Sequence, residues 1–447
     1  MKIISKLSVV PSFWSCKGRH PTGAWLFALL VFPIIMLIPS GDALALSQFA
    51  KKYGMSCNTC HTAFPRLTYM GEKFMRDGYQ FNQDGNSKKQ KVNDRLVLDD
   101  LDNLFGIRLN LRPVEYTTNG IDEDGDREDH LTFGKTNWVQ FFVGGTIYKN
   151  TSIFIEYEVN DEDESHFSWY KLIFTNLFGP QGSANLVLGQ QAPMEWMPAS
   201  GRLRVMPDRE GLAWGPKSSA GATAIGTDDP EDEVGITGAR PAISFYGYQG
   251  PLVYFAGVSP GDEAGGNDLN NEISTWLGAR LDLTGGTFAG SGVGVFAMQG
   301  TDAANTAGVA PAQTTNDWDR LSLQGVLRMG GWDVTAGLTS GEDDNWILTP
   351  VDVSQEFDST FAQLGYLFGG SKQYYATLRY QNLEWDDTAL AAAVGLEDEE
   401  EQIAASLYYF PMENLKIGLN VLLDETDYRD PLTKEEDVYH ITIRTMF

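Results

Sequence analysis

The stretch LKIGLNVLLD at residues 415–424 carries the pattern that decides the fold. Apolar side chains stand at positions 415, 417, 419, 421 and 423, and polar or small residues stand at 416, 418, 420 and 424. Successive side chains of a β-strand point to opposite faces, so this period of two predicts a strand with one apolar and one polar face. A length of about ten residues is what a tilted strand needs to cross a membrane.

The same alternation recurs along the chain. Further examples are residues 107–112, 153–160, 321–328 and 373–381. In a soluble β-sandwich the apolar face would be the core, whereas in an outer-membrane barrel it would meet lipid and the polar face would line the lumen. The alternation alone leaves both architectures open.

The connections between these strands favour the barrel. Short turns at Lys149-Asn150, Gly330-Gly331 and Gly369-Gly370 alternate with long acidic loops, and outer-membrane barrels are built with this asymmetry. We therefore predict that residues 104–447 have an all-β fold. It would be a transmembrane antiparallel β-barrel of about 16 strands, within a range of about 14 to 18.

The chain ends in a predicted strand that closes on Phe447. Alternation places its residues on two faces. One face has Phe447, Ile443, Ile441 and Tyr439, and the other has Met446, Arg444, Thr442, His440 and Val438. A terminal Phe preceded by alternating apolar residues resembles the C-terminal signature of bacterial outer-membrane proteins.

The predicted long loops carry acidic runs at residues 122–129, 161–164, 228–233, 342–344 and 397–401. One interpretation is a set of solvated outer loops that bind Ca²⁺ or Mg²⁺ loosely. The other is a mouth that attracts a divalent metal substrate, because carboxylates suit hard cations. The whole chain has 33 Lys and Arg against 60 Asp and Glu, a net charge of −27, which argues against nucleic acid as a partner.

The first 45 residues have the features of an export signal. An apolar run from Ala24 to Ile38 precedes an A-x-A cleavage site at residues 43–45, and four basic residues come before the run: Lys2, Lys6, Lys17 and Arg19. The alternative is an uncleaved anchor helix, but the run is shorter than the roughly 20 residues that span a bilayer, and it contains Pro33. We predict a signal peptide at residues 1–45 and a location in the outer membrane of a Gram-negative bacterium.

The motif Cys57-Asn58-Thr59-Cys60-His61 has the C-x-x-C-H spacing of a covalent haem c site. The two thiols can add to the haem vinyl groups, and the histidine then becomes the proximal ligand of the iron. The third cysteine, Cys16, lies in the predicted signal peptide, so a zinc site would lack ligands. A thioredoxin-like redox pair needs a βαβ context, and none follows. We therefore predict one covalently attached haem c.

Residues 46–103 form the predicted haem-binding segment and its linker. One helix is expected over residues 62–79, with Pro65 at its first turn and Gly78 at its C-terminal cap. Its apolar face would contain Ala63, Leu67, Met70 and Phe74, with Arg66, Glu72, Lys73 and Asp77 facing elsewhere. About 40 structured residues rarely bury a core alone, so the haem should dock in or at the barrel lumen.

The second axial ligand of the iron stays open. Met55, Met70 and Met75 are nearby candidates, but Met70 lies on the expected apolar helix face and Met commonly fills gaps in a core. His440 is a further candidate, because alternation points it into the lumen. No catalytic residue beyond the haem is predicted.

The complete layout resembles the fused monohaem cytochrome–porins of iron-oxidising bacteria. Phe49-Ala50-Lys51 leads into the haem motif, and the family pattern there is close to A-x-P-x-F-A-R-x-T. Ala45, Phe49 and Ala50 match it, whereas Ser47, Lys51 and Tyr53 replace the Pro, Arg and Thr.

The resemblance implies a function in electron transfer across the outer membrane. The protein would oxidise extracellular Fe(II) and pass the electron to a periplasmic cytochrome, as an iron:cytochrome c oxidoreductase. Cys57 and Cys60 would tether the haem and His61 would hold its iron. Lumen-facing arginines are candidates to neutralise the haem propionates, or they form ordinary lumen lining with Glu156 or Glu158: Arg108, Arg112, Arg379 and Arg444.

Two alternatives remain beside the oxidation of iron. The chain could be an electron conduit for another extracellular donor. It could also be a diffusion porin in which the haem is a plug or a sensor, which predicts solute flux and no reduction by Fe(II).

Overall fold

The structure is a computed structural model, and all the residues that it describes belong to one compact unit, 41–447. The described residues are 48–81, 90–91, 97–98, 104–121, 127–134, 137–148, 150–160, 165–200, 236, 239–260, 272–305, 313–344, 354–385, 397–428 and 433–446. The predicted signal peptide and most of the predicted linker lie outside them. Among these residues, no helix is long and apolar enough to cross a membrane.

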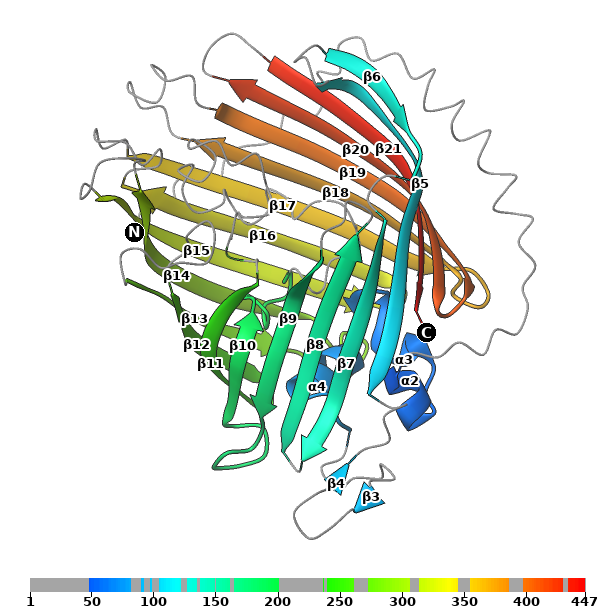
Figure 1. The fold of residues 1–447 in the computed structure, drawn as a ribbon, viewed down its shortest axis with the longest axis vertical. Helices are drawn as coiled ribbons and strands as arrows, with labels where there is room; N and C mark the ends of the chain where they lie inside the picture. The colour runs from blue at the N-terminus through cyan, green and yellow to red at the C-terminus, as the bar shows by residue number, and fades with distance from the viewer. Residues whose placement is uncertain are drawn as a thin grey trace. The chain divides into compact units, whose positions relative to one another are not determined.

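A closed antiparallel β-barrel forms the body of the described chain (Figure 1). Its strands are β5 (Phe105–Ile121), β6 (Arg127–Thr132), β7 (Trp138–Tyr148), β8 (Thr151–Asn160), β9 (Ser165–Phe174), β10 (Asn185–Gln191), β11 (Arg240–Gln249), β12 (Leu252–Pro260), β13 (Ile273–Asp282), β14 (Gly292–Asn305), β15 (Gln313–Met329), β16 (Trp332–Asp343), β17 (Gln355–Phe368), β18 (Tyr374–Trp385), β19 (Glu397–Met412), β20 (Leu415–Tyr428) and β21 (Thr433–Met446).

The last strand closes the barrel on the first, because β21 pairs with β5 from Asp437 opposite Thr118 to Met446 opposite Arg108. In Figure 1 the red β21 lies beside the cyan β5. Strands β6 and β7 pair with successive parts of β5, so they share one position in the wall. Within the described residues the barrel therefore has sixteen positions, as predicted.

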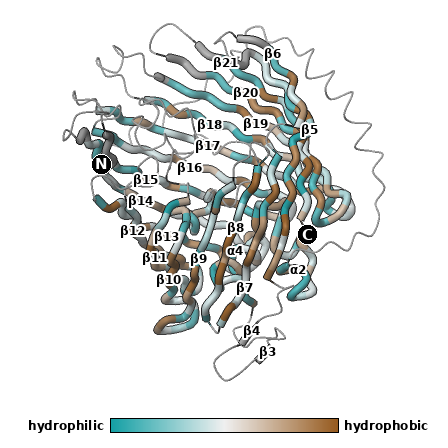
Figure 2. The backbone as a smooth tube through the Cα atoms, in the orientation of Figure 1, coloured by the Kyte–Doolittle hydropathy of each residue, from teal (hydrophilic) through white to brown (hydrophobic). Residues whose placement is uncertain are grey.

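The faces of the strands decide between the sandwich and the membrane barrel. Along β17 buried and exposed side chains alternate, and hydrophobic and hydrophilic residues follow one another along the strands in Figure 2. Many of the exposed side chains are apolar, as at Leu338 and Leu378, while Gln324 and Arg379 are buried inside. Apolar residues outside and polar residues inside are the arrangement of a lipid-facing barrel. The prediction of an outer-membrane β-barrel is confirmed.

Short turns join the strands at one end of the barrel, which we call the short-turn end. They include the turns between β7 and β8, β11 and β12, β15 and β16, β17 and β18, and β19 and β20. Asn150, Gly330 and Gly369 have positive φ angles there, as tight turns require. In outer-membrane barrels the short turns lie on the periplasmic side.

Two of the predicted acidic loops are instead parts of strands. Residues 342–343 end β16, where Glu342 pairs with Glu356, and residues 397–401 begin β19, where Glu399 pairs with Asp427. The strands extend beyond the apolar alternation because backbone pairing tolerates charged residues outside the lipid. The acidic residues 161–164 and 228–233 lie outside the described residues, as do 122–126 of the first run.

The N-terminal segment is more broken than predicted. It contains α2 (Gln48–Tyr53), α3 (Cys57–Cys60), β1 (His61–Ala63), β2 (Arg66–Leu67) and α4 (Tyr69–Arg76), and two short strands follow, β3 (Gln90–Lys91) and β4 (Val97–Leu98). The predicted single helix over residues 62–79 is wrong, because β1 and β2 form a hairpin around Pro65. The N-cap of α4 is Thr68, whose Oγ1 accepts a hydrogen bond from the Gly71 amide. Gly78 follows the C-cap with φ +70°, as predicted.

The later start of α4 also changes its buried face. The prediction that Met70 packs on the apolar face is wrong, because 46% of it is exposed. Glu72 and Arg66 were expected to face elsewhere, yet 1% and 2% of them are exposed. Phe74 and Met75 are buried in a core with Tyr79, Phe142 and Phe154. Charged residues of α4 therefore lie inside the barrel.

Candidate haem-attachment site

The two cysteines of the motif lie one helical turn apart on α3. Ser56 caps this short helix, and its Oγ accepts a hydrogen bond from the Asn58 amide at 3.2 Å. Cys57 and Cys60 are half-buried and form no disulfide. Burial raises the pKa of the Cys57 thiol to about 11, and the negative charge of Glu413 adds to this shift. Both thiols are thus free and on one side of a helical turn.

His61 follows directly as the first residue of β1. Burial lowers the pKa of its imidazole to about 4, with smaller effects in the same direction from the positive charges of Arg108 and Lys416. The backbone carbonyl groups of Pro65 and Arg66 lie near the ring and act in the opposite direction. A neutral imidazole beside a carbonyl acceptor is the form in which histidine binds a metal. Two thiols and this histidine fit haem c.

Helix α4 packs closely against the motif. The Thr68 amide donates to the Cys60 carbonyl at 2.9 Å, and Thr68 Oγ1 donates to the Thr59 carbonyl at 2.8 Å. A Cβ atom at Gly71 would lie 2.1 Å from the Cys60 carbonyl oxygen, so only glycine fits this approach. The motif, the β1–β2 hairpin and α4 therefore form one small folded body.

The barrel wall contacts this body at the short-turn end. Glu413, in the turn between β19 and β20, accepts hydrogen bonds from Ser56 Oγ at 2.7 Å and from the Cys57 amide at 2.9 Å. Lys416 on β20 donates from Nζ to the Phe64 carbonyl at 2.7 Å. Ala63 is buried against Tyr375 and Tyr408. Strands β18 to β20 are thus the wall beside the motif.

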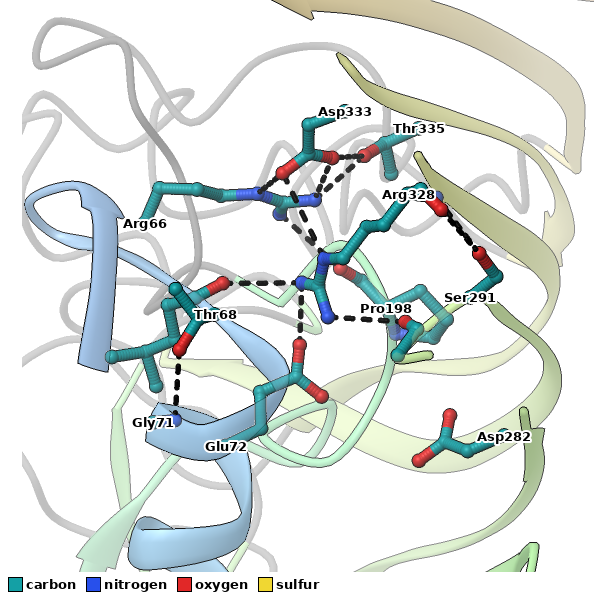
Figure 3. Close-up of polar contacts among 12 residues, drawn as sticks. Arg66, Thr68, Gly71, Glu72, Pro198, Asp282, Ser291, Arg328, Asp333 and Thr335 are labelled. Atoms are coloured by element: carbon teal, nitrogen blue, oxygen red, sulfur yellow. Dashed lines mark hydrogen bonds and ion pairs between the residues drawn. The ribbon is translucent and has the colours of Figure 1, made fainter. Parts of the chain in front are cut away.

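Buried ion pairs attach α4 to another part of the wall (Figure 3). Glu72 contacts Arg328 of β15 at 2.6 Å, the pair that Figure 3 shows. It also contacts Arg280 of β13 at 2.7 Å and Arg76 of its own helix at 3.2 Å. Burial by itself would raise the pKa of Glu72, but the three arginines lower it to about 2. Glu72 is therefore a carboxylate throughout the physiological pH range.

A second set of ion pairs extends this attachment. Arg66 contacts Asp333 of β16 through Nε at 2.9 Å and through Nη2 at 2.7 Å, and Nη2 also donates to Thr335 at 2.8 Å. Figure 3 shows the Arg66 guanidinium facing Asp333 and Thr335. Arg76 contacts Asp282 of β13 at 2.8 Å. A two-point contact between an arginine and a carboxylate fixes the relative orientation of the two side chains and also stabilises their pairing.

Residues 192–200, which we call the inner loop, lie against the same helix. They follow β10 and are buried, and both Met194 and Met197 are fully so. Arg280 donates to the Trp196 carbonyl and Arg66 to the Pro198 carbonyl, each at 3.4 Å. Trp196 stacks on Tyr246, whose hydroxyl donates to the Arg76 carbonyl at 2.7 Å. The inner loop and α4 therefore pack together inside the barrel.

The candidate distal ligands lie in different surroundings. Met75 is 5% exposed and belongs to the core, Met55 is half-buried, and Met70 is the most exposed of the three. His440 on β21 points inward as predicted and is 1% exposed. The identity of the distal ligand stays a prediction.

The arginines proposed for the propionates also differ in their contacts. Arg108 pairs with Glu156 at 2.9 Å, which agrees with ordinary lumen lining, although its charge also reaches His61. Arg112 pairs with Glu115, and Arg379 donates to Gln381 at 2.8 Å. Arg444 is buried on β21. In the part of the chain that the structure describes, no group of three or more His, Cys, Asp or Glu residues is arranged to hold a metal ion.

Sequence reasoning identified the motif but missed the residues that hold it. These contacts join residues more than 200 positions apart in the sequence. Glu413 meets Cys57, and Lys416 meets Phe64. Glu72 meets Arg280 and Arg328. The signal that was available is the charge of Arg280 and Arg328 on strands with apolar alternation, which marks lumen-facing positions. It does not tell which partner each would meet.

Comparisons with known proteins concern the barrel. Three solved structures have the same fold: an anion-selective porin from Comamonas acidovorans, the outer-membrane channel DcaP of Acinetobacter baumannii, and OprB of Pseudomonas putida. Their TM-scores are 0.51, 0.52 and 0.50, at 13%, 11% and 10% sequence identity. Each match covers 77% of this chain, and 98%, 96% and 94% of the other chain.

No protein-family model and no curated protein matches the sequence. The likeness to solved structures at this low identity shows the fold, which is that of outer-membrane porins. It says nothing of a cytochrome segment or of haem.

Proposed function

We propose that this chain is an outer-membrane electron-transfer protein, a porin-type barrel that carries one covalent haem c at the short-turn end of its lumen. The observation that carries the proposal is the placement of the motif. Cys57, Cys60 and His61 belong to a small body that buried ion pairs attach to the inside of the barrel.

The residues of the chain have separable roles in this proposal. Cys57 and Cys60 would form the thioether links and His61 would bind the iron. The haem would supply reversible one-electron transfer. Thr68 and Gly71 hold α4 against the motif, and Glu72 and Arg66 hold α4 inside the barrel. This arrangement keeps the motif on the periplasmic side, where a soluble cytochrome would accept the electron.

Extracellular Fe(II) is the proposed electron donor. The resemblance to fused cytochrome–porins suggests it, and the net charge of −27 favours the approach of a cation. Another reduced species is the alternative donor. Among the described residues, no group of three or more His, Cys, Asp or Glu residues is arranged to hold a metal ion.

Two measurements test the proposal on the purified full chain. Covalent haem is detected by haem staining in a denaturing gel, and Cys57→Ala with Cys60→Ala should abolish the stain. In a stopped-flow experiment, Fe(II) should shift the Soret and α bands to the reduced form. A stained protein that Fe(II) does not reduce at any pH tested would overturn the iron assignment and leave the haem in place.

A second candidate is a diffusion channel with the N-terminal segment as its plug. The porin-type fold favours it, because the solved structures with this fold are named as a porin and a channel. The buried inner loop and α4 oppose it, since they occupy the lumen. Conductance in planar bilayers separates the two candidates. A steady ionic conductance of the unmodified chain, as large as that of an open diffusion pore, would support the channel.

A further inference from the structure

Two oppositely charged residues, one in the turn before β20 and one at the start of β20, contact the two ends of the segment that carries the motif. Glu413 accepts hydrogen bonds at the first end, from Ser56 and the Cys57 amide. Lys416 donates at the other end, to the Phe64 carbonyl. The motif, Cys57–His61, lies between these contacts. One short piece of the barrel therefore holds both sides of the site.

The two charges have different surroundings. Lys416 is 1% exposed, and its Nζ lies 5.2 Å from the ring centre of Phe64 and 4.7 Å from that of Tyr408. A charge in such a poorly solvated place acts strongly on its neighbours. Glu413 is exposed, so water and salt screen its charge. The positive charge should therefore have the larger effect.

Each charge lies beside a different part of the motif. Glu413 accepts a hydrogen bond from the amide of Cys57, and Lys416 donates to the carbonyl of Phe64, three residues after His61. The thiol end would carry the haem edge and the histidine end would carry its iron. The field across the motif thus has a negative and a positive side.

We propose that Glu413 and Lys416 are positioning residues that orient the haem motif against β20 and set the reduction potential of the haem in opposite directions. With haem attached here, one electron from a mediator would reduce its iron and remove one positive charge from the site. A nearby cation favours the ferrous form and a nearby anion favours the ferric form. This inference rests on the proposed haem attachment and is independent of the electron donor.

The test is a spectroelectrochemical titration of the detergent-purified full chain with chemical mediators. In Lys416→Gln the ferrous-to-ferric ratio at a fixed applied potential should fall at least tenfold, which is a drop of about 59 mV for a one-electron couple. In Glu413→Gln the ratio should rise, by less than tenfold, and the rise should shrink at high salt. Lys416→Arg keeps the charge and should restore the ratio of the unmodified protein.

Lys372→Gln is the matched control, because Lys372 is an exposed lysine in the neighbouring turn between β17 and β18. It should leave the ratio unchanged. Shifts of both variants in the same direction would overturn the inference, because they would mean only that each substitution loosens the haem and exposes it to solvent. No shift in either variant would also overturn it. If Lys416→Gln fails to form a barrel, the sign of the Glu413→Gln shift and its salt dependence still decide.

The outcomes separate this inference from the proposed function. Opposite shifts in a protein that Fe(II) does not reduce would support the inference and overturn the iron donor. An unmodified chain without covalent haem would overturn both.

Discussion

The N-terminal segment meets the barrel on two sides that are built differently. On the arginine side, Glu72, Arg66 and Arg76 of the segment form buried ion pairs with β13, β15 and β16. On the motif side, Ser56 and Cys57 donate hydrogen bonds to Glu413 in the β19–β20 turn, and the Phe64 carbonyl accepts one from Lys416 on β20. The first side consists of charges removed from water, and the second includes an exposed carboxylate.

The two sides therefore have different roles: one docks the N-terminal segment in the barrel, and the other contacts the proposed haem site. Removing one member of a buried ion pair leaves its partner charged and unsolvated, so the arginine side tolerates little change. The motif side makes weaker contacts that also involve the groups proposed to bind haem. We expect the arginine side to determine whether the segment stays in the lumen, and the motif side to determine how the site performs.

The largest effect is expected from Glu72→Leu. The variant leaves Arg280 and Arg328 without this carboxylate, at a cost of about 3–5 kcal/mol to the docking of the segment. Cleavage within residues 48–81 by an added protease should become faster by more than about a hundredfold, since cleavage follows the population of the open form. Lys73→Gln, at the exposed neighbouring position, is the control. Equal cleavage rates in Glu72→Leu and the unmodified chain would contradict the role of the arginine side.

Acid should weaken the same side. The pKa of Glu72 falls from 4.5 to about 2 on docking, so its contribution is full above pH 4.5 and is lost as pH falls toward 2. At about 1.4 kcal/mol per pH unit, this contribution is on the order of 3 kcal/mol. Bilayer conductance of the full chain should stay constant from pH 7 to 5 and rise below about pH 4. A rise that is complete at pH 5 would mean that another group controls docking.

Gly71→Ala tests the join between the two sides. The added methyl group would meet the Cys60 carbonyl, so α4 must move away from the motif at a cost of about 1–3 kcal/mol. The yield of haem-stained, folded barrel should fall severalfold. Gly285→Ala is the control, because a Cβ atom at Gly285 meets open space. A normal yield would show that α4 and the motif do not need this close approach.

The smallest effect is expected on the motif side, from Ser56→Ala. The variant removes the N-cap of α3 and the hydrogen bond to Glu413, with a loss of about 1 kcal/mol. Proteolysis between residues 48 and 61 should speed up about fivefold, far less than in Glu72→Leu. Ser371→Ala, in the turn between β17 and β18, should have no effect. An effect as large as that of Glu72→Leu would remove the distinction between the two sides.

Local patterns predicted much of this molecule. The alternation around residues 415–424 predicted lumen-facing Lys416 and Asn420, and both are buried. The terminal strand placed His440 inward correctly for the same reason. These predictions succeed because lipid and lumen impose opposite polarity on alternate residues of every strand.

Predictions failed where strand pairing competed with the structure that the local pattern favoured. A helix over residues 62–79 agreed with the spacing of Ala63, Leu67, Met70 and Phe74, yet His61–Ala63 pairs with Arg66–Leu67 and delays the helix to Tyr69. The runs 342–344 and 397–401 were expected in loops because of their charge, yet strand pairing extends through most of them. The charge of a segment predicts that its side chains are solvated. It does not predict whether its backbone forms hydrogen bonds with a neighbouring strand.

The sequence by itself determined the barrel and its even, antiparallel closure, and it located the motif at Cys57–His61, because both depend on residues close together in the chain. Only the tertiary structure decided where the motif lies and what holds it. Glu72 meets Arg280 and Arg328, and the Cys57 amide meets Glu413, across more than 200 positions. Such pairs form because closing the barrel removes charges from water and leaves each of them dependent on whichever opposite charge or polar group the fold brings within reach.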